Sequence, residues 1–538
     1  MGGRVRVTAR LVEHSRVGVA LLLVFAFGLS WWGGSRGFHP SDSNILFDGG
    51  WRILSGQIPY KDFVAPVIVP MYLQAIFFKI FGVNFNAYRL HAAVVNMVAT
   101  GLSLIVLRGL LPARPWLWGT GALFTAVWFY PFWGTPWYYQ SSVFFGLIGV
   151  ACVLRARKLC LHETSGSRLP QALGFAMSSA PFFVLSFLSK QTSGGLFMVF
   201  PLLLWLTPPW PRKPGYLLLG YGFALLASSM AVIALVAHFA DWSLFKYHVF
   251  ELPPTNMAHV LSRQYYLSKS SGLLLLMALS VLLPVALRLW FVSERRRDIF
   301  LPLVCFAAIS VFHEINIALS TSPAFGSLSL LGIQIVLGYY LLDEICLSLT
   351  SFRWQSQGLF QGLRGGYIGM MWLVFLAGLF LVQSGRWKTG PSAILAQPIV
   401  SGPLSGLRWP ETIVPMNRQN VIDALDFVCH TRESVYIWGS MTLFYGVSGK
   451  ASIPPVLWYH EGNCFPSTYD ARMREIDLWT LRKIQQANPR YVMGNEPLMF
   501  FNPHPYFKET VRYLQNHYAL KHQRFGPWLT LFERKDNV

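Results

Sequence analysis

Charged residues are scarce in this sequence. Only 13% of its 538 residues are Asp, Glu, Lys or Arg, whereas 53% are hydrophobic, and the mean hydropathy is +0.42. So little charge excludes a soluble globular protein of this length. We therefore expect much of the chain to lie in a lipid bilayer.

Acidic residues are the scarcer of the two charged kinds. The chain has 24 Asp and Glu against 44 Lys and Arg, a formal net charge of +20. Such an excess is typical of nucleic-acid binding, but the cytoplasmic loops of membrane proteins produce it as well. Because the basic residues gather in short loops between apolar runs, we expect no nucleic-acid partner.

Long apolar runs take the place of the missing charge. A spanning helix needs about 20 mostly apolar residues. Candidate runs lie at about 17–32, 87–107, 117–133, 139–154, 171–189, 193–207, 215–238, 271–291, 299–319, 325–345 and 367–384. The first run follows a basic segment and has no small-residue cleavage pattern after it, which predicts a retained signal anchor. The predicted fold class is a polytopic α-helical membrane protein with about 11 transmembrane helices.

One further apolar run, from Pro66 to Phe81, is assigned by the positive-inside rule. If it does not span, one side of the membrane collects 17 basic loop residues: Arg4, Arg6, Arg10, Arg16, Arg108, Arg114, Arg155, Arg157, Lys158, Arg168, Arg212, Lys213, Arg295, Arg296, Arg297, Arg353 and Arg364. If it spanned, every later loop would change sides and most of this bias would invert. We therefore expect an interfacial helix here, a cytoplasmic N-terminus, and residues 385–538 outside.

Acidic residues of the membrane part concentrate in two predicted outer loops. Five of the 12 that precede residue 385 lie there: Asp42, Asp48 and Asp62 in the first, Asp241 and Glu251 in the long loop after the seventh span. Loops this long are usually functional or disordered. Glu314 lies well inside a span, where an ionisable residue indicates a functional site. The alternative for Glu314 is a polar contact between helices, with His313 or Asn316 as partner.

The first outer loop contains a recognisable motif. It reads SDSNILFDGGWRILSGQIPYKDFVAPVIVPMYLQAIFFKIFG and continues into NFNAYRLHAAVVNMVATGLSL. An acid after the first span, then G-x-x-P-Y-K-D-F, a proline-led apolar segment and an Arg-bearing helix resemble the GT-C superfamily of glycosyltransferases. The closest resemblance is to bacterial relatives of protein mannosyltransferases and lipid A aminoarabinose transferases, and the later FLSKQTSGG stretch agrees with it.

The resemblance implies an activity and a location. These enzymes transfer a sugar, with inversion, from a polyprenyl-phosphate donor to an acceptor, which here would be a glycan, lipid or protein in the cell envelope. The resemblance implies a hexosyl- or pentosyltransferase in a bacterial inner (plasma) membrane, with residues 1–384 as the transmembrane catalytic domain. Outer-face chemistry also favours a lipid-borne sugar, because nucleotide sugars are cytoplasmic.

A carboxylate on the outer face suits this chemistry, because an acceptor hydroxyl needs a base to take its proton. Asp42 occupies the position of the family's catalytic Asp, counting back from Gly56, and Asp48 is the second candidate. Asp62 sits where the YKDF element would orient substrate. A cap or an ion pair with Lys61 is the structural alternative for Asp62.

The leaving lipid phosphate calls for fixed cations. The candidates on the outer side are Lys61, Arg52, Arg89, Lys190 and Arg263, and no spacing ranks them. Their structural alternative is an interfacial Lys or Arg that reaches lipid headgroups. The predicted substrate-binding set consists of these five cations together with Asp62 and Glu314.

The second outer loop lacks acids altogether. It reads PFWGTPWYYQSS, whereas metal-dependent members of the superfamily carry an acidic pair there. We therefore predict no metal, no other cofactor, and a monophosphate donor rather than a pyrophosphate-linked one. The aromatic residues of this loop could stack on sugars, but membrane anchoring is the commoner role of such residues.

Residues 385–538 lack long apolar runs and predict a small extracytoplasmic α/β domain. The segments 434–438, 490–494 and the WLTLFER stretch predict strands, and Asp470 to Asn488 predicts a helix. An oxidising compartment would allow Cys429 and Cys464 to pair, which we predict. We find no nucleophile triad, metal cluster or phosphate loop in this part, and we assign it to acceptor binding or site coverage.

Two alternatives to a transferase stay open. A transporter or flippase for lipid-linked sugars would also use many helices, although the spans carry few ionisable residues and no inverted repeat is visible. A non-catalytic scaffold with the same fold would tolerate the missing acids of the second outer loop.

Overall fold

The computed structural model describes most of the chain. Described are residues 2–35, 43–111, 114–130, 134–161, 167–205, 214–253, 329–350, 357–384, 402, 404–408, 412–413, 416–439, 441–457, 464–466, 468–494, 506–522, 525 and 529–535. Asp42, Arg263, His313, Glu314 and the predicted spans at 271–291 and 299–319 lie outside the described residues.

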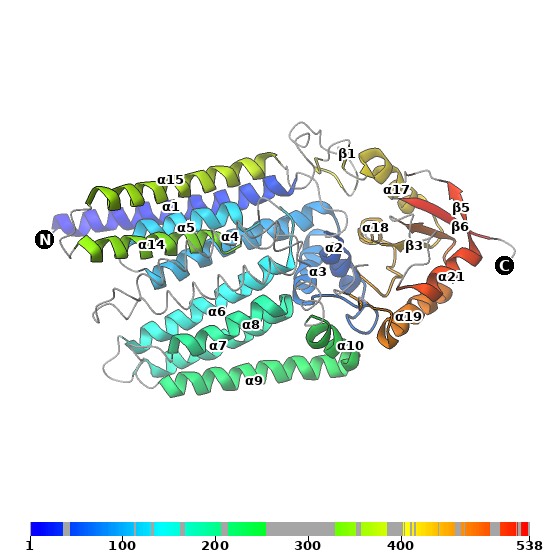
Figure 1. Cartoon of the computed structure of the whole chain (residues 1–538), viewed down its shortest axis with the longest axis horizontal. Coiled ribbons are helices and arrows are strands. Elements are labelled where there is room, and N and C mark those ends of the chain that lie inside the picture. Colours follow the sequence, from blue (N-terminus) through cyan, green and yellow to red (C-terminus); the bar gives the residue numbers. More distant parts are fainter. Residues whose placement is uncertain are drawn as a thin grey trace.

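A bundle of long helices forms the N-terminal part (Figure 1). Its helices are α1 (Gly2–Gly34), α4 (Phe85–Leu110), α5 (Pro115–Trp128), α6 (Tyr138–Leu161), α7 (Leu169–Ser189), α8 (Gln191–Trp205), α9 (Pro214–Phe239), α14 (Leu331–Thr350) and α15 (Gln357–Ser384). Each coincides with a predicted span. Five are long and apolar enough to cross a membrane, within α1, α4, α7, α9 and α15. The described chain is thus a polytopic helical membrane protein.

Buried polar side chains tie the helices of the bundle together. On α4, the Asn96 amide donates to the carbonyl oxygens of Ala26 on α1 and Ala126 on α5, at 2.8 and 3.0 Å. In a membrane such bonds link helices that the hydrophobic effect does not drive together. The Asn84 side chain begins α4, because its Oδ1 accepts from the Ala87 N–H at 2.9 Å.

Two short helices lie at one end of the bundle, which we call the loop end. They are α2 (Ser43–Leu54) and α3 (Val69–Phe81), and Figure 1 shows both between the bundle and the C-terminal part. The 13 residues of α3 extend only about 20 Å, less than the roughly 30 Å of a bilayer core. Tyr72, Ile76 and Ile80 of α3 form an exposed apolar stripe opposite the buried Met71 and Phe78. The helix is therefore too short to span, and its interfacial position stays a prediction.

The C-terminal part contains a four-stranded mixed sheet in the order β3-β4-β6-β5. Its strands are β3 (Val435–Trp438), β4 (Tyr491–Gly494), β5 (Tyr518–His522) and β6 (Thr530–Arg534). The β3–β4 pair is parallel and the other pairs are antiparallel. Around it lie α17 (Arg418–His430), α18 (Leu443–Ser448), α19 (Ala471–Ala487), α21 (Lys508–His517) and a hairpin of β1 (Thr412–Ile413) and β2 (Met416–Asn417).

Three of these strands and α19 lie where the sequence predicts them, and the predicted disulfide is wrong. Cys429 and Cys464 are both thiols. Cys429 is exposed on α17, whereas Cys464 is fully buried and its carbonyl oxygen contacts the His248 ring at 3.0 Å. The two cysteines therefore occupy different environments.

Candidate functional site

A buried ion pair joins the first loop to the C-terminal part. Asp48 and Arg52 lie one turn apart on α2, and the Arg52 Nε is 2.8 Å from Asp48 Oδ2 with both side chains 0% exposed. The Ser452 hydroxyl donates to Asp48 Oδ1 at 2.7 Å, and Arg52 Nη1 donates to the Pro454 carbonyl oxygen at 2.6 Å. Burial raises the pKa of Asp48, although Arg52 and Ser452 oppose that shift.

Further contacts seat the C-terminal part on α2. The Trp51 indole donates to the Lys450 carbonyl oxygen at 2.9 Å, and the Leu443 N–H donates to Asn44 Oδ1 at 3.0 Å. Val64 and Val456 form a β-bridge. A Cβ on Gly446 would lie 3.0 Å from the Phe47 and Trp51 side chains, so α18 approaches α2 closely because this residue has no side chain.

The YKDF element is a tight turn that contacts the segment after α9. Tyr60 has a positive φ of 62°, and its buried hydroxyl donates to the Ala65 carbonyl oxygen at 3.0 Å. Asp62 Oδ2 accepts from the Ile58 N–H at 2.8 Å, which is the capping role given above as its alternative. Lys61 is exposed.

The same turn packs on α10 (Trp242–Lys246) and the π-helix η1 (Tyr247–Glu251). The Tyr60 ring lies 5.4 Å from that of Phe245 and 5.9 Å from that of His248. The Tyr60 carbonyl oxygen accepts from the Asp241 N–H at 3.0 Å. The two predicted acidic loops are therefore in direct contact.

The beginning of α2 lies beside the second predicted outer loop. The Tyr88 hydroxyl lies 3.0 Å from the Ser43 carbonyl oxygen and 3.4 Å from that of Pro136. Ser43, with which the described part of this loop begins, therefore lies beside the aromatic segment that begins at Trp137.

Lys190 lies against that aromatic segment. Its Nζ is 5.3 Å and 5.0 Å from the ring centroids of Tyr138 and Tyr139. The first loop reaches the same place, since the Ile68 N–H donates to the Leu188 carbonyl oxygen at 3.4 Å. The half-buried ammonium of Lys190, two tyrosine rings and the entry into α2 therefore lie close to one another at the loop end.

Arg89 faces a different helix. Its Nη2 donates to the Trp31 carbonyl oxygen at 2.7 Å, its Nη1 donates to Asn86 Oδ1 at 3.0 Å, and its Cζ lies 4.0 Å from the Trp31 ring centroid. These contacts are with α1 and with its own helix. The predicted cations are thus divided among the C-terminal interface (Arg52), the aromatic segment (Lys190) and α1 (Arg89).

Sequence reasoning did not single out three residues of this region. Tyr88 lies in the quoted Arg-bearing helix, three residues after its first residue, Phe85, and the motif could have indicated it. Ser452 and His248 carry no such signal, because their partners are distant in the sequence. Burial lowers the pKa of His248, whose ring nitrogens lie 2.8 and 3.0 Å from the Leu244 and Cys464 carbonyl oxygens.

Among the described residues no group of three or more His, Cys, Asp and Glu side chains could hold a metal ion. The acids of this region are spread instead. Asp48 is in the interface, Asp62 caps its own turn, and Asp241 begins α10 by accepting from the Leu244 N–H. The predicted absence of a metal stays a prediction, because Asp42 and Glu314 lie outside the described residues.

The arrangement as a whole is a helical bundle with short loop helices across one end and a C-terminal mixed sheet over them. In fold the chain is similar to ArnT, a lipid A aminoarabinose transferase of the GT-C class of glycosyltransferases, from Cupriavidus metallidurans. The apo structure of ArnT matches with a TM-score of 0.51 at 13% identity, over 97% of this chain and 98% of that one. Its structure bound to undecaprenyl phosphate matches at 0.50 and 12%, over 98% of both chains.

Other comparisons add less. The Archaeoglobus fulgidus oligosaccharyltransferase tethered with an acceptor peptide matches at 10% identity, over 93% of this chain and 72% of that one, but its TM-score of 0.49 is too low to support an argument. No protein-family model matches the sequence, and no curated protein matches it. Likeness at these identities establishes the fold alone.

Proposed function

We propose that this protein is an inverting glycosyltransferase that moves a sugar from a polyprenyl-phosphate donor to an acceptor on the extracytoplasmic face of the membrane. The observation that carries the proposal is the likeness to ArnT over 98% of both chains, in a structure of ArnT that contains undecaprenyl phosphate. In this proposal residues 1–384 form the catalytic domain and residues 385–538 a domain that covers the first loop.

Asp42 is the proposed base. Asp48 is less suited to that role, because Arg52 and Ser452 occupy its two carboxylate oxygens and the side chain is fully buried. A base must reach the proton that it removes within hydrogen-bond distance. Asp42 precedes Ser43, which the Tyr88 hydroxyl holds beside the aromatic segment.

Lys190 is the proposed cation for the leaving phosphate. Arg52 already bonds the Pro454 carbonyl oxygen and Asp48, and Arg89 already bonds the Trp31 carbonyl oxygen and Asn86. The described contacts of the Lys190 ammonium are with two aromatic rings, which leave its N–H donors for an anion. A fixed positive charge at that place would stabilise the phosphate as the sugar departs.

The proposed orientation is supported by basic residues at the end opposite the loop end. Arg114 and Arg364, both predicted to be cytoplasmic, pair with the same residue, Asp343, at 2.8 and 3.1 Å. The N-terminus lies at that end of the molecule and the C-terminus at the other (Figure 1). A cytoplasmic N-terminus therefore implies an extracytoplasmic C-terminal sheet.

The test is release of polyprenyl phosphate from a panel of polyprenyl-phosphate sugars by the purified protein. We expect Asp42→Asn to lower the rate by about 10²–10⁴-fold, the usual contribution of a general base, and a chelator to change nothing. Asp426→Asn is the matched control, because Asp426 is exposed on α17. Equal release by the wild type and Asp42→Asn would move the base to Asp48. Release by neither would favour transport or scaffolding.

A further inference from the structure

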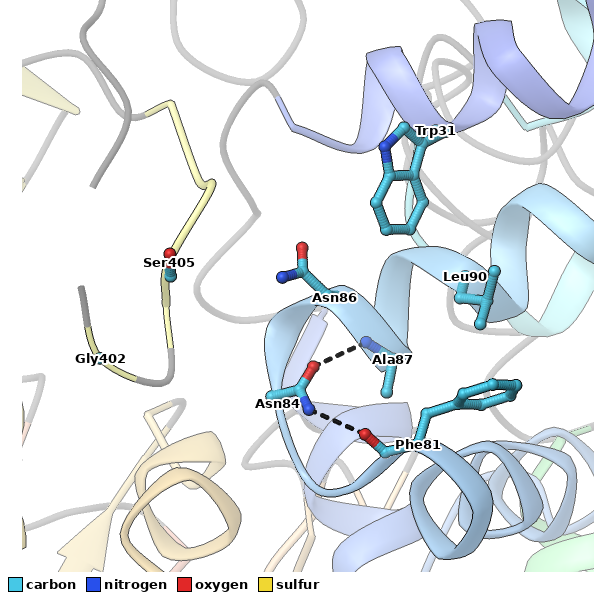
Figure 2. Close-up of a pocket in the computed structure, with 8 residues that line it drawn as sticks. All are labelled: Trp31, Phe81, Asn84, Asn86, Ala87, Leu90, Gly402 and Ser405. Atoms are coloured by element: carbon cyan, nitrogen blue, oxygen red, sulfur yellow. Dashed lines mark hydrogen bonds between the residues drawn. The ribbon is translucent and has the colours of Figure 1, made fainter. Parts of the chain in front are cut away.

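A cavity of about 440 Å³ opens at the loop end, on the α1 side of the bundle. It lies between the end of α1, the α3–α4 turn and the turn at residues 404–407 that precedes the C-terminal sheet (Figure 2). Pockets that bind small molecules and lipid head groups commonly have volumes of about 300–1,000 Å³. This cavity has the volume of a binding site, and the proposed chemistry at Asp42 and Lys190 does not use it.

The lining of the cavity is divided by polarity. Trp31, Phe81 and Leu90 supply apolar walls, and Asn86 and Ser405 supply polar groups. None of the described residues that line it is charged. An uncharged wall of an indole, an amide and a hydroxyl favours a ligand that is itself uncharged and carries hydroxyl groups.

The amide of Asn86 is held in one orientation. Arg89 Nη1 donates to Asn86 Oδ1 at 3.0 Å, which fixes the carbonyl side and leaves the NH₂ group as a donor. Figure 2 shows the Asn86 nitrogen directed toward the turn that carries Ser405. The neighbouring Asn84 differs, because its side chain is occupied by the Ala87 N–H and the Phe81 carbonyl oxygen. Asn86 is therefore the amide that can bond a ligand.

The indole of Trp31 is fixed by the same arginine. The guanidinium of Arg89 lies over one face of the Trp31 ring at 4.0 Å and bonds the Trp31 carbonyl oxygen. The positive charge of Arg89, which contacts the lining residues Trp31 and Asn86, favours electron-rich oxygen atoms within the cavity. A sugar ring satisfies both features, since its C–H face packs on an aromatic ring and its hydroxyls accept hydrogen bonds.

The apolar side of the cavity continues onto the exposed apolar stripe of α3. Phe81 is 51% exposed and follows directly on Ile80, which is 66% exposed and ends the apolar stripe of α3. A hydrocarbon stem attached to a head group in the cavity would lie along this stripe. The cavity therefore fits a membrane lipid better than a free sugar.

We propose that this cavity binds the uncharged, hydroxyl-bearing head group of a glycolipid and presents it as the acceptor. The proposal rests on the proposed transferase function and specifies its acceptor class. The cavity and the candidate active site share α4, because Ala87 lines the cavity and the adjacent Tyr88 contacts Ser43. An acceptor bound here would enter from the lipid on the α1 side.

Binding of monoglucosyl diacylglycerol to the full-length protein in detergent, measured by native mass spectrometry, tests the site. Phosphatidylglycerol with the same acyl chains is the anionic comparison. Asn86→Leu should weaken binding of the glucosyl lipid about tenfold through loss of the amide hydrogen bonds. Leu90→Trp should abolish it by filling the cavity. The matched controls are Asn516→Leu in the C-terminal part and Leu373→Trp on the lipid-facing side of α15, both exposed.

Two results would overturn the site. The first is that both cavity variants bind the glucosyl lipid as well as the wild type does. The second is that phosphatidylglycerol binds as well as the glucosyl lipid and is weakened equally by both variants. If Leu90→Trp fails to fold, Asn86→Leu still decides. Polyprenyl phosphate release is measured on the same preparations. If the cavity variants weaken lipid binding but no polyprenyl phosphate is released, the site is supported and the transferase function is overturned. If polyprenyl phosphate is released but neither variant changes lipid binding, only the site is overturned.

Discussion

Two aspartates at opposite ends of the bundle are paired with arginine in different surroundings. Asp48 pairs with Arg52 at the loop end, and both side chains are 0% exposed. Asp343 pairs with Arg114 and Arg364 at the other end, where it is 12% exposed and the arginines are 33% and 28% exposed. The first pair is closed off by the C-terminal part, while the second keeps contact with its surroundings.

The difference in exposure decides what each pair contributes. A fully buried charge depends on its partner, because removal of one member leaves the other without compensation. A partly exposed pair is screened by solvent and contributes little to the stability of the protein. We infer that the Asp48–Arg52 pair controls whether the C-terminal part stays seated on α2, and that the Asp343 cluster adjusts local packing only.

The largest effect is expected from Arg52→Met. It removes the partner of Asp48 and the bond to the Pro454 carbonyl oxygen. This should lower the free energy of unfolding by about 3–5 kcal/mol. We expect a lower midpoint of thermal unfolding. Hydrogen–deuterium exchange should become faster in peptides that contain Val64 and Leu457, whose amides bond across the interface.

Exchange in the bundle helices serves as the internal control for Arg52→Met. Loss of protection spread evenly over the whole chain would show a general destabilisation and would contradict a role specific to the interface. The double variant Asp48→Leu with Arg52→Met removes both charges and should recover part of the lost stability.

The second effect concerns pH. Burial raises the folded-state pKa of Asp48 above its ordinary value, so the stability that this group contributes is present at low pH and is lost as the pH rises through the raised pKa. Arg52 opposes the shift. The thermal midpoints of wild type and Arg52→Met should therefore move closer together from about pH 8 to about pH 5, because a protonated Asp48 no longer needs a cation. A gap that widens on acidification would refute this account.

The smallest effect is expected from Arg114→Met. Arg364 remains paired with Asp343 Oδ1 at 3.1 Å, and the site is partly exposed. The free energy of unfolding should therefore fall by less than about 1 kcal/mol. The thermal midpoint and the exchange of the Val64 peptide should match the wild type. A loss as large as that of Arg52→Met would remove the distinction between the two ends.

The features that the sequence predicts correctly depend on local pattern. Apolar runs mark the spans, and the bias of basic loop residues argues against a span from Pro66 to Phe81, where the structure has the short helix α3. The segments 434–438 and 490–494 predict strands because they are short and apolar, and the structure places β3 and β4 there. The Asp48–Arg52 pair was not predicted, although its spacing of one helical turn is visible in the sequence.

The features that the sequence does not predict depend on distant partners. Ser452 is 404 residues from Asp48, and nothing in either segment indicates the other. The same holds for the contact of Lys190 with Tyr138. It also holds for Arg89, which contacts α1 and not the aromatic segment. The disulfide prediction failed because compartment chemistry permits a bond but gives no geometry.

The bridge between Val64 and Val456 has a consequence for biogenesis. The two segments that it joins are made at very different times, since translation at about 5–20 residues per second takes tens of seconds to cover the intervening chain. During that interval the newly inserted first loop lacks the bonds that Asp48 and Arg52 make to Ser452 and Pro454. The loop can therefore reach its final form only after most of the chain has been translated. We expect truncated nascent chains that end before Ser452 to leave this loop accessible to protease.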